Sequence, residues 1–160
     1  MKRTLFLFTF LILVAVAASP LLAEDSPFVG TWKLNTEKSK FEPGPGPKSM
    51  TRTVEAQGDG LKYSFEGVGA DGSAVAYSFS SNFDGKDSAI TGAGMPGGAD
   101  TILLKRVSSS KTMGTMKKDG KVIGKSEATV SPDGKVATVK SKGKAPDGKA
   151  FHMISVYDKQ

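Results

Sequence analysis

Apolar and polar residues alternate one by one along most of the chain, which is typical of β-strands that bury one face. In residues 61–68, Leu61, Tyr63 and Phe65 fall on one face, and charged and hydroxyl residues fall on the other. Residues 73–83 repeat the pattern, and nothing after the first 25 residues shows a long helical period. We expect about ten strands, near residues 31–34, 48–57, 61–68, 73–83, 87–92, 100–107, 111–118, 121–130, 135–142 and 149–158.

Asp-Gly pairs separate the alternating stretches. They are Asp59-Gly60, Asp71-Gly72, Asp84-Gly85, Asp119-Gly120, Asp133-Gly134 and Asp147-Gly148. Asp-Gly tolerates the positive φ angles that tight hairpin turns demand. Consecutive hairpins build an antiparallel meander, and closing a meander removes its unpaired edges. The sequence therefore predicts an all-β fold, an antiparallel up-and-down β-barrel of about 8–10 strands.

Residues 28–50 depart from the hairpin pattern, because three prolines alternate with glycines at their centre. We expect a strand around 31–34, a single helical turn at 36–41 and a stiff, extended crossing at 42–47. A barrel usually needs a lid or plug at one end. We therefore expect the crossing to pass over the barrel and Trp32 to plug the closed end.

The N-terminus has the order of a secretory signal peptide: a positive pair, an apolar run and then small residues. The run of about 14 apolar residues is short for a bilayer span of ~20. We expect cleavage after Ala23; an earlier site after Ala17 and an uncleaved anchor are the alternatives. The sequence thus predicts a signal peptide at 1–23 and a single domain at 24–160 without a membrane span, located in the periplasm or outside the cell.

Charge is distributed unevenly along the chain, whose formal net charge is +6. Residues 24–102 carry a net charge of −4, whereas residues 103–160 carry +8. Such a basic half can attract anionic lipid, polysaccharide or nucleic acid. Few aromatic residues interleave with the lysines, so the pattern does not favour nucleic acid. A solvated lysine surface is the simpler interpretation, with weak contact to anionic envelope components as a possible partner interaction.

The opening residues also carry a family resemblance. Phe28-Val29-Gly30-Thr31-Trp32 resembles the Gly-x-Trp entry strand of the lipocalin and avidin group of barrels. The longer stretch through Phe41 and the following prolines, together with residues 83–92, 99–106 and 156–160, resembles an uncharacterised family of secreted bacterial lipocalin-like proteins. The resemblance implies a lipocalin-like barrel in the cell envelope or outside the cell. It implies no activity, since such barrels host carriers, inhibitors and a few enzymes.

One feature of lipocalins has no obvious counterpart here. In those proteins an arginine from the last strand packs over the entry tryptophan, but this last strand offers only Lys149 and Lys159. We expect Arg106 to pack over Trp32, because it alternates with apolar residues on its strand. Arg52, a lysine or no partner at all are the alternatives.

Candidate catalytic chemistry is sparse. The chain has one histidine and no cysteine, which argues against a His-based metal site and a cysteine nucleophile. His152 is more simply a partly exposed strand residue than a general base, and most carboxylates lie in turns. We interpret the glycine-rich stretch 92–98 as a mobile loop at the barrel rim. We therefore predict no catalytic residue, no metal and no cofactor.

Inward-facing aromatic residues give two interpretations of the barrel interior. They line a cavity for a small apolar ligand, whose polar end meets tyrosine hydroxyls and Arg106, or they simply fill the core. The candidate ligand-binding residues are Trp32, Tyr63, Phe65, Tyr77, Phe79, Leu104, Arg106, Phe151, Met153 and Tyr157. We predict a carrier of a small hydrophobic or amphipathic ligand. The alternatives are an envelope-associated interaction or structural protein with a basic C-terminal surface, and a metal-independent enzyme such as an isomerase.

Overall fold

The computed structural model describes residues 26–145 and 147–160. The predicted signal peptide lies outside these residues. The strands are β1 (Gly30–Leu34), β2 (Lys40–Glu42), β3 (Ser49–Gln57), β4 (Gly60–Val68), β5 (Ala74–Ser81), β6 (Ser88–Ala89), β7 (Thr91–Ala93), β8 (Thr101–Ser108), β9 (Lys111–Lys118), β10 (Lys121–Val130), β11 (Val136–Lys144) and β12 (Ala150–Lys159). A short 3₁₀ turn, η2, covers Pro96–Gly98. In the described part of the chain, no helix is long and apolar enough to span a membrane.

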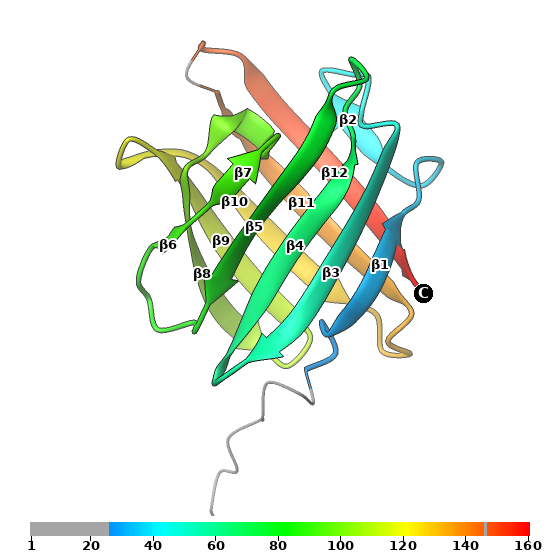
Figure 1. The fold of residues 1–160 in the computed structure, drawn as a ribbon, viewed down its shortest axis with the longest axis vertical. Coiled ribbons are helices and arrows are strands. Elements are labelled where there is room, and N and C mark those ends of the chain that lie inside the picture. Colours follow the sequence, from blue (N-terminus) through cyan, green and yellow to red (C-terminus); the bar gives the residue numbers. More distant parts are fainter. Residues whose placement is uncertain (1–25, 146) are drawn as a thin grey trace, which may run out of the picture.

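The strands form one antiparallel sheet that curls into a nearly closed barrel (Figure 1). Its order is β6-β8-β9-β10-β11-β12-β1-β3-β4-β5-β7, so almost every strand pairs with its neighbour in sequence. The segment Ser88–Ala93 joins the two ends, because β6 pairs with β8 and β7 pairs with β5. The predicted all-β, up-and-down barrel is thereby confirmed. The single strand expected at 87–92 is divided into two short strands, β6 and β7.

Turn chemistry fixes the register of the hairpins. Between β9 and β10, Asp119 has a φ of 48° and Gly120 a φ of 74°. Two successive positive φ angles are what a two-residue hairpin turn requires to match the twist of its strands. The weak alternation at 135–142 still forms a full strand, β11, because it pairs along its length with both β10 and β12.

The segment after β1 differs from the expectation of one helical turn at 36–41. The turn is confined to Thr36–Lys38, and β2 follows at once. Ser39 determines this path: its hydroxyl donates to the Asn35 carbonyl at 2.6 Å and accepts from the Val156 amide at 2.9 Å. β2 then pairs with His152–Ile154 of β12, so it extends the edge that β1 begins.

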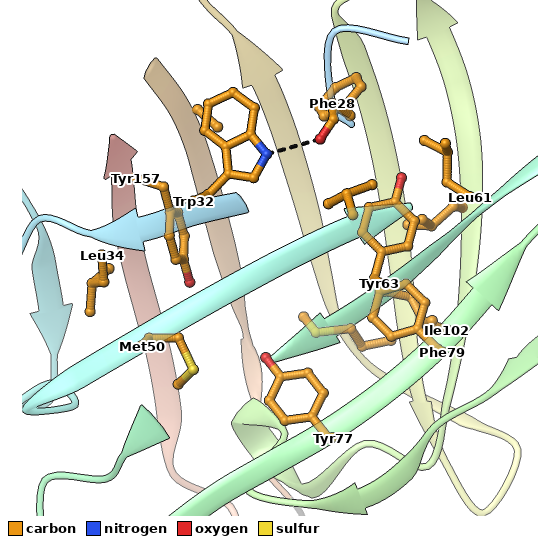
Figure 2. Close-up of a cluster of buried hydrophobic side chains, with 14 of the residues drawn as sticks. Phe28, Trp32, Leu34, Met50, Leu61, Tyr63, Tyr77, Phe79, Ile102 and Tyr157 are labelled. Carbon is orange, nitrogen blue, oxygen red and sulfur yellow. Dashed lines mark hydrogen bonds between the residues drawn. The ribbon is translucent and has the colours of Figure 1, made fainter. Parts of the chain in front are cut away.

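The closed end of the barrel is filled by large side chains. Trp32 is 0% exposed, and its indole Nε1 donates to the Phe28 carbonyl at 2.9 Å (Figure 2). Phe28, Val54 and Leu61 are also fully buried in this cluster. Burying an aromatic side chain completely contributes roughly 1.5–3 kcal/mol through area alone. The interior space therefore lies toward the opposite end, and Trp32 plugs the closed end as expected.

Candidate functional site: a cavity with a buried arginine

A cavity of about 100 Å³ lies inside the barrel, beyond the closed end. Its lining residues are Arg52, Tyr63, Phe65, Tyr77, Phe79, Met95, Pro96, Ile102, Leu104, Thr112, Met116, Ser126, Ala128, Val139, Ser141, Met153, Ser155 and Tyr157. Drug-sized ligands usually occupy pockets of ~300–1,000 Å³. The barrel is thus mostly filled and partly hollow, which combines the two interpretations that the sequence leaves open.

One wall of the cavity is aromatic. Adjacent positions on β4 and β5 place Tyr63 on Phe79, with ring centroids 4.9 Å apart, and Phe65 on Tyr77, with centroids 4.5 Å apart. Both pairs are stacked. Cross-strand aromatic pairs of this kind stabilise a sheet. They also hold the rings against each other on this wall.

The facing wall carries small residues and hydroxyl groups. Thr112, Ser126, Ser141 and Ser155 line the cavity from four consecutive strands, β9 to β12. Ser126 and Ser141 are direct cross-strand neighbours. Because these side chains are short, they cannot reach the aromatic wall, and space remains between the two. This wall offers hydrogen-bond donors and acceptors to whatever fills that space.

Arg52 is the most unusual residue of the site. It projects from β3 and is only 3% exposed, yet its Nε and Nη1 atoms have no hydrogen-bond partner in the described structure. Its guanidinium carbon lies 5.3 Å from the centroid of the Tyr63 ring and 5.9 Å from that of Phe28. Burial lowers the pKa of Arg52, because the charged form loses its hydration. No carboxylate forms an ion pair with it among the described residues.

Three buried tyrosines, Tyr63, Tyr77 and Tyr157, lie near this guanidinium. Burial raises the pKa of Tyr63, Tyr77 and Tyr157 above the usual value, so all three phenols stay protonated and neutral at ordinary pH. The Tyr63 hydroxyl is buried without a partner in the described structure. Figure 2 shows the hydroxyls of Tyr77 and Tyr157 directed into the barrel interior. The site therefore presents a cation and neutral donors, a combination suited to an anionic group.

A surface pocket, which we call the mouth, lies next to the cavity. It has a volume of about 300 Å³ and shares Pro96 and Met153 with the cavity. Its other lining residues are Glu42, Pro43, Gly97, Ala145, Asp147, Lys149, Ala150 and Phe151. Pro96 and Gly97 of the glycine-rich stretch border this pocket, which agrees with the expected place of that stretch at the rim. Of the proline-rich segment, Pro43 borders it, next to Glu42 at the end of β2.

The structure places most of the candidate ligand-binding residues on the cavity. Those that line it are Tyr63, Phe65, Tyr77, Phe79, Leu104, Met153 and Tyr157, and Phe151 lines the mouth. Trp32 belongs to the plug and Arg106 lies outside the lining. That any of them binds a ligand stays a prediction. The site candidates missed include Arg52 and the hydroxyl residues Thr112, Ser126, Ser141 and Ser155. For Arg52, a charged residue on the apolar side of its strand was the available signal.

The expectation that Arg106 packs over Trp32 is wrong. Lys159 takes that place, with its Nζ 5.0 Å from the indole centroid. β1 pairs Trp32 directly with Lys159 of β12, which brings this cation within reach. Arg106 instead lies over the Phe83 ring at 4.4 Å. This contact joins β8 to Phe83, which follows β5 in the chain. It lies between β5 and β8, the two strands at the ends of the sheet that are otherwise connected through β6 and β7.

Other chemistry of the described residues is limited. His152 is exposed on the outer face of β12, and its Nδ1 lies 3.8 Å from a carboxylate oxygen of Glu42. No group of three or more potential metal ligands occurs among the described residues.

No protein-family model matches the chain, and no curated protein matches it. Among solved structures, the chain is similar to the zebrafish ileal bile acid-binding protein crystallised with cholic acid. The two share 13% sequence identity, and the match covers 84% of this chain and 100% of that one, with a TM-score of 0.49. The barrel itself is defined by the strand order and register of this chain.

Proposed function

We propose that this protein is an exported binding protein that holds a small amphipathic anion inside its barrel. The anionic group meets the guanidinium of Arg52, and the apolar part lies along the stacked rings toward the mouth. The observation that carries the proposal is the burial of Arg52 with two unpartnered nitrogens.

Burying a charge without a counter-ion costs several kcal/mol. Buried polar groups are normally paired, so an orphaned guanidinium requires an explanation. A carboxylate, sulfate or phosphate supplies the missing acceptors, and the guanidinium of arginine makes strong charge-assisted hydrogen bonds to such anions. The neutral tyrosines nearby add donors without adding opposing charge.

The dimensions of the interior favour a slender molecule. The inner cavity has room for the head group and a few more atoms, and the apolar mouth of about 300 Å³ accommodates a tail. Three methionines, Met95, Met116 and Met153, line the inner cavity. Unbranched thioether side chains adapt to different ligand shapes. A single-tailed amphiphile therefore suits this interior better than a bulky polycycle.

Export to the periplasm or the outside of the cell is part of the proposal. It rests on the order of charged, apolar and small residues in the first 23 positions. The mass of the protein recovered from the periplasmic or culture fraction tests this part. A chain starting at residue 24 supports it, and recovery of only the uncleaved chain in membranes contradicts it.

The binding proposal is tested with octanoate and octanol, which have the same number of carbon atoms and differ in head-group charge. Titration followed by calorimetry should show saturable binding of octanoate that exceeds that of octanol by at least tenfold. The variant Arg52→Met should lose this preference, because it removes the cation and keeps an apolar side chain of similar length. Arg106→Met is the matched control, since Arg106 lies outside the cavity lining.

Three results would contradict the proposal: no saturable binding of either probe, equal affinity for both, or an unchanged preference in Arg52→Met. Native mass spectrometry of protein purified without denaturation identifies the natural ligand class. A discrete additional mass that disappears on denaturation is the expected result.

A further inference from the structure

Lysines on β9 of the outer wall formed by β8 to β12 pair with carboxylates, but three lysines on β10 and β11 do not. Lys125, Lys140 and Lys142 are exposed, and none lies within 4.0 Å of a carboxylate in the described part of the chain. Glu127, the acid between them, already pairs with Lys111 at 2.8 Å. Lys140 lies opposite Glu127 across the strands and is partly compensated by it, whereas Lys125 and Lys142 have no such acidic neighbour on the paired strands.

These lysines are arranged as cross-strand neighbours. Lys125 on β10 lies directly opposite Lys142 on β11, which in turn lies opposite His152 on β12. Like charges directly opposite each other destabilise a sheet. Around them lies a surface hollow of about 440 Å³, lined by Met113, Lys125, Ser126, Glu127, Lys140, Ser141, Lys142 and His152. An anion placed in this hollow relieves the repulsion.

The same wall also exposes apolar side chains. Val107, Met113 and Val122 are 54%, 46% and 58% exposed, and they are the exposed large hydrophobic residues of the described chain. They belong to β8, β9 and β10, respectively. The opposite wall, β3 to β5, has no such residue among those described, and it stands in front in Figure 1. Apolar and cationic exposure thus coincide on one side of the barrel.

We propose that this outer wall docks on an anionic lipid bilayer. Lysines near such a surface are attracted by its negative potential, and exposed apolar side chains enter the interface between head groups and acyl chains. A soluble acidic polysaccharide would use the charge but not the three apolar side chains. Ser126 and Ser141 border both the hollow and the cavity, but the lysines and the exposed apolar residues of the wall are absent from the cavity lining. The proposal therefore stands independently of the binding function proposed above.

Vesicle co-sedimentation tests the proposal with two matched double variants. Lys125→Gln/Lys142→Gln removes two charges from the docking wall, and Lys33→Gln/Lys62→Gln removes two from exposed positions on β1 and β4. With vesicles of 30% phosphatidylglycerol in phosphatidylcholine, we expect the first variant to bind roughly 30-fold more weakly than the wild type, at ~5-fold per lysine. For the second variant, the decrease in the logarithm of the vesicle affinity should be less than half of that for the first variant. Both variants share the same N-terminal segment, so any contribution of that segment cancels.

Single cysteine labels identify the face that meets the lipid, because the chain contains no native cysteine. An environment-sensitive dye at Met113→Cys should shift to shorter wavelength when vesicles are added, and a dye at Thr51→Cys on the opposite wall should not. Equal weakening by both double variants, a shift at both labels, or no vesicle binding at low salt overturns the proposal. A response of the Met113→Cys dye to dextran sulfate but not to vesicles overturns it in favour of a soluble polyanion.

Discussion

At the scale of single residues, Arg52 lowers the stability of the fold and provides the proposed anion-binding group. Replacing an uncompensated buried charge with an apolar side chain removes its desolvation cost. We expect Arg52→Met to raise the free energy of unfolding by about 1–4 kcal/mol, the gain found when buried ion pairs are replaced by apolar residues, while it abolishes the preference for anions. Urea denaturation measures the first effect and calorimetry the second.

The comparison variant for that measurement is Arg106→Met, which loses the contact with Phe83 and is expected to be neutral or slightly destabilising. A lower stability of Arg52→Met would mean that the contacts of Arg52 with Phe28 and Tyr63 outweigh its desolvation. The guanidinium would then be a structural element of the core rather than a residue kept for a ligand.

The cation over Trp32 can be tested directly, because Trp32 is the single tryptophan of the chain. We expect Lys159→Met to change the intensity of Trp32 emission and to lower the free energy of unfolding by about 0.5–1 kcal/mol, the value of an exposed cation–π contact. Arg106→Met should leave the emission unchanged. An altered emission in Arg106→Met with none in Lys159→Met would reverse the assignment of the cation.

At the scale of elements, the cavity exists because the wall of β9 to β12 carries small side chains. Ala128 lines the cavity, so Ala128→Leu should fill part of it. We expect ligand affinity to fall at least tenfold and thermal stability to stay level or rise, because added methylenes enter vacant space. Thr129→Leu, whose side chain points outward from the same strand, should leave affinity unchanged. Unaltered binding in Ala128→Leu would place the ligand elsewhere.

Most elements could be predicted from the sequence, since strict alternation and Asp-Gly turns are local signals. The segment 88–93 and β2 could not be predicted as they are, because both depend on partners far away in sequence. Residues 88–93 run between β5 and β8, whose facing edges are parallel to each other. The segment pairs first with β8 as β6 and then with β5 as β7. β2 forms where Ser39 ties the chain to Val156. The aromatic wall was predictable, whereas the hydroxyl wall was hidden in strands with weak alternation.

The charged residues also show which features a local pattern predicts and which depend on distant partners. An arginine on the apolar side of a strand marked Arg52 as buried, but alternation alone could not show that no carboxylate would meet it. The placement of Arg106 was wrong because its partner is decided by the seam between β5 and β8, which only the closed barrel creates. Sequence patterns thus define faces, and the closure of the barrel defines which faces meet.

At the scale of the whole molecule, the three tyrosines of the chain couple its stability to alkaline pH. Burial raises the pKa of Tyr63, Tyr77 and Tyr157 in the folded state. In the unfolded chain each phenol ionises near pH ~10. Above that pH the unfolded state binds fewer protons than the folded state, so the free energy of unfolding falls as the pH rises. Stability from these groups is therefore complete below pH ~10 and is lost above it.

We expect the absorbance of ionised tyrosine at 295 nm to rise in one cooperative step above pH ~10, together with loss of the β-sheet circular dichroism. The two signals should coincide because the phenols reach water only when the barrel opens. Independent titration of the tyrosines near their ordinary pKa, with the sheet signal intact, would contradict the buried placement of these side chains. A bound anion should shift the step to higher pH, since it stabilises the folded barrel alone. Arg52→Met should abolish this shift, which links the titration of the whole molecule to the proposed site.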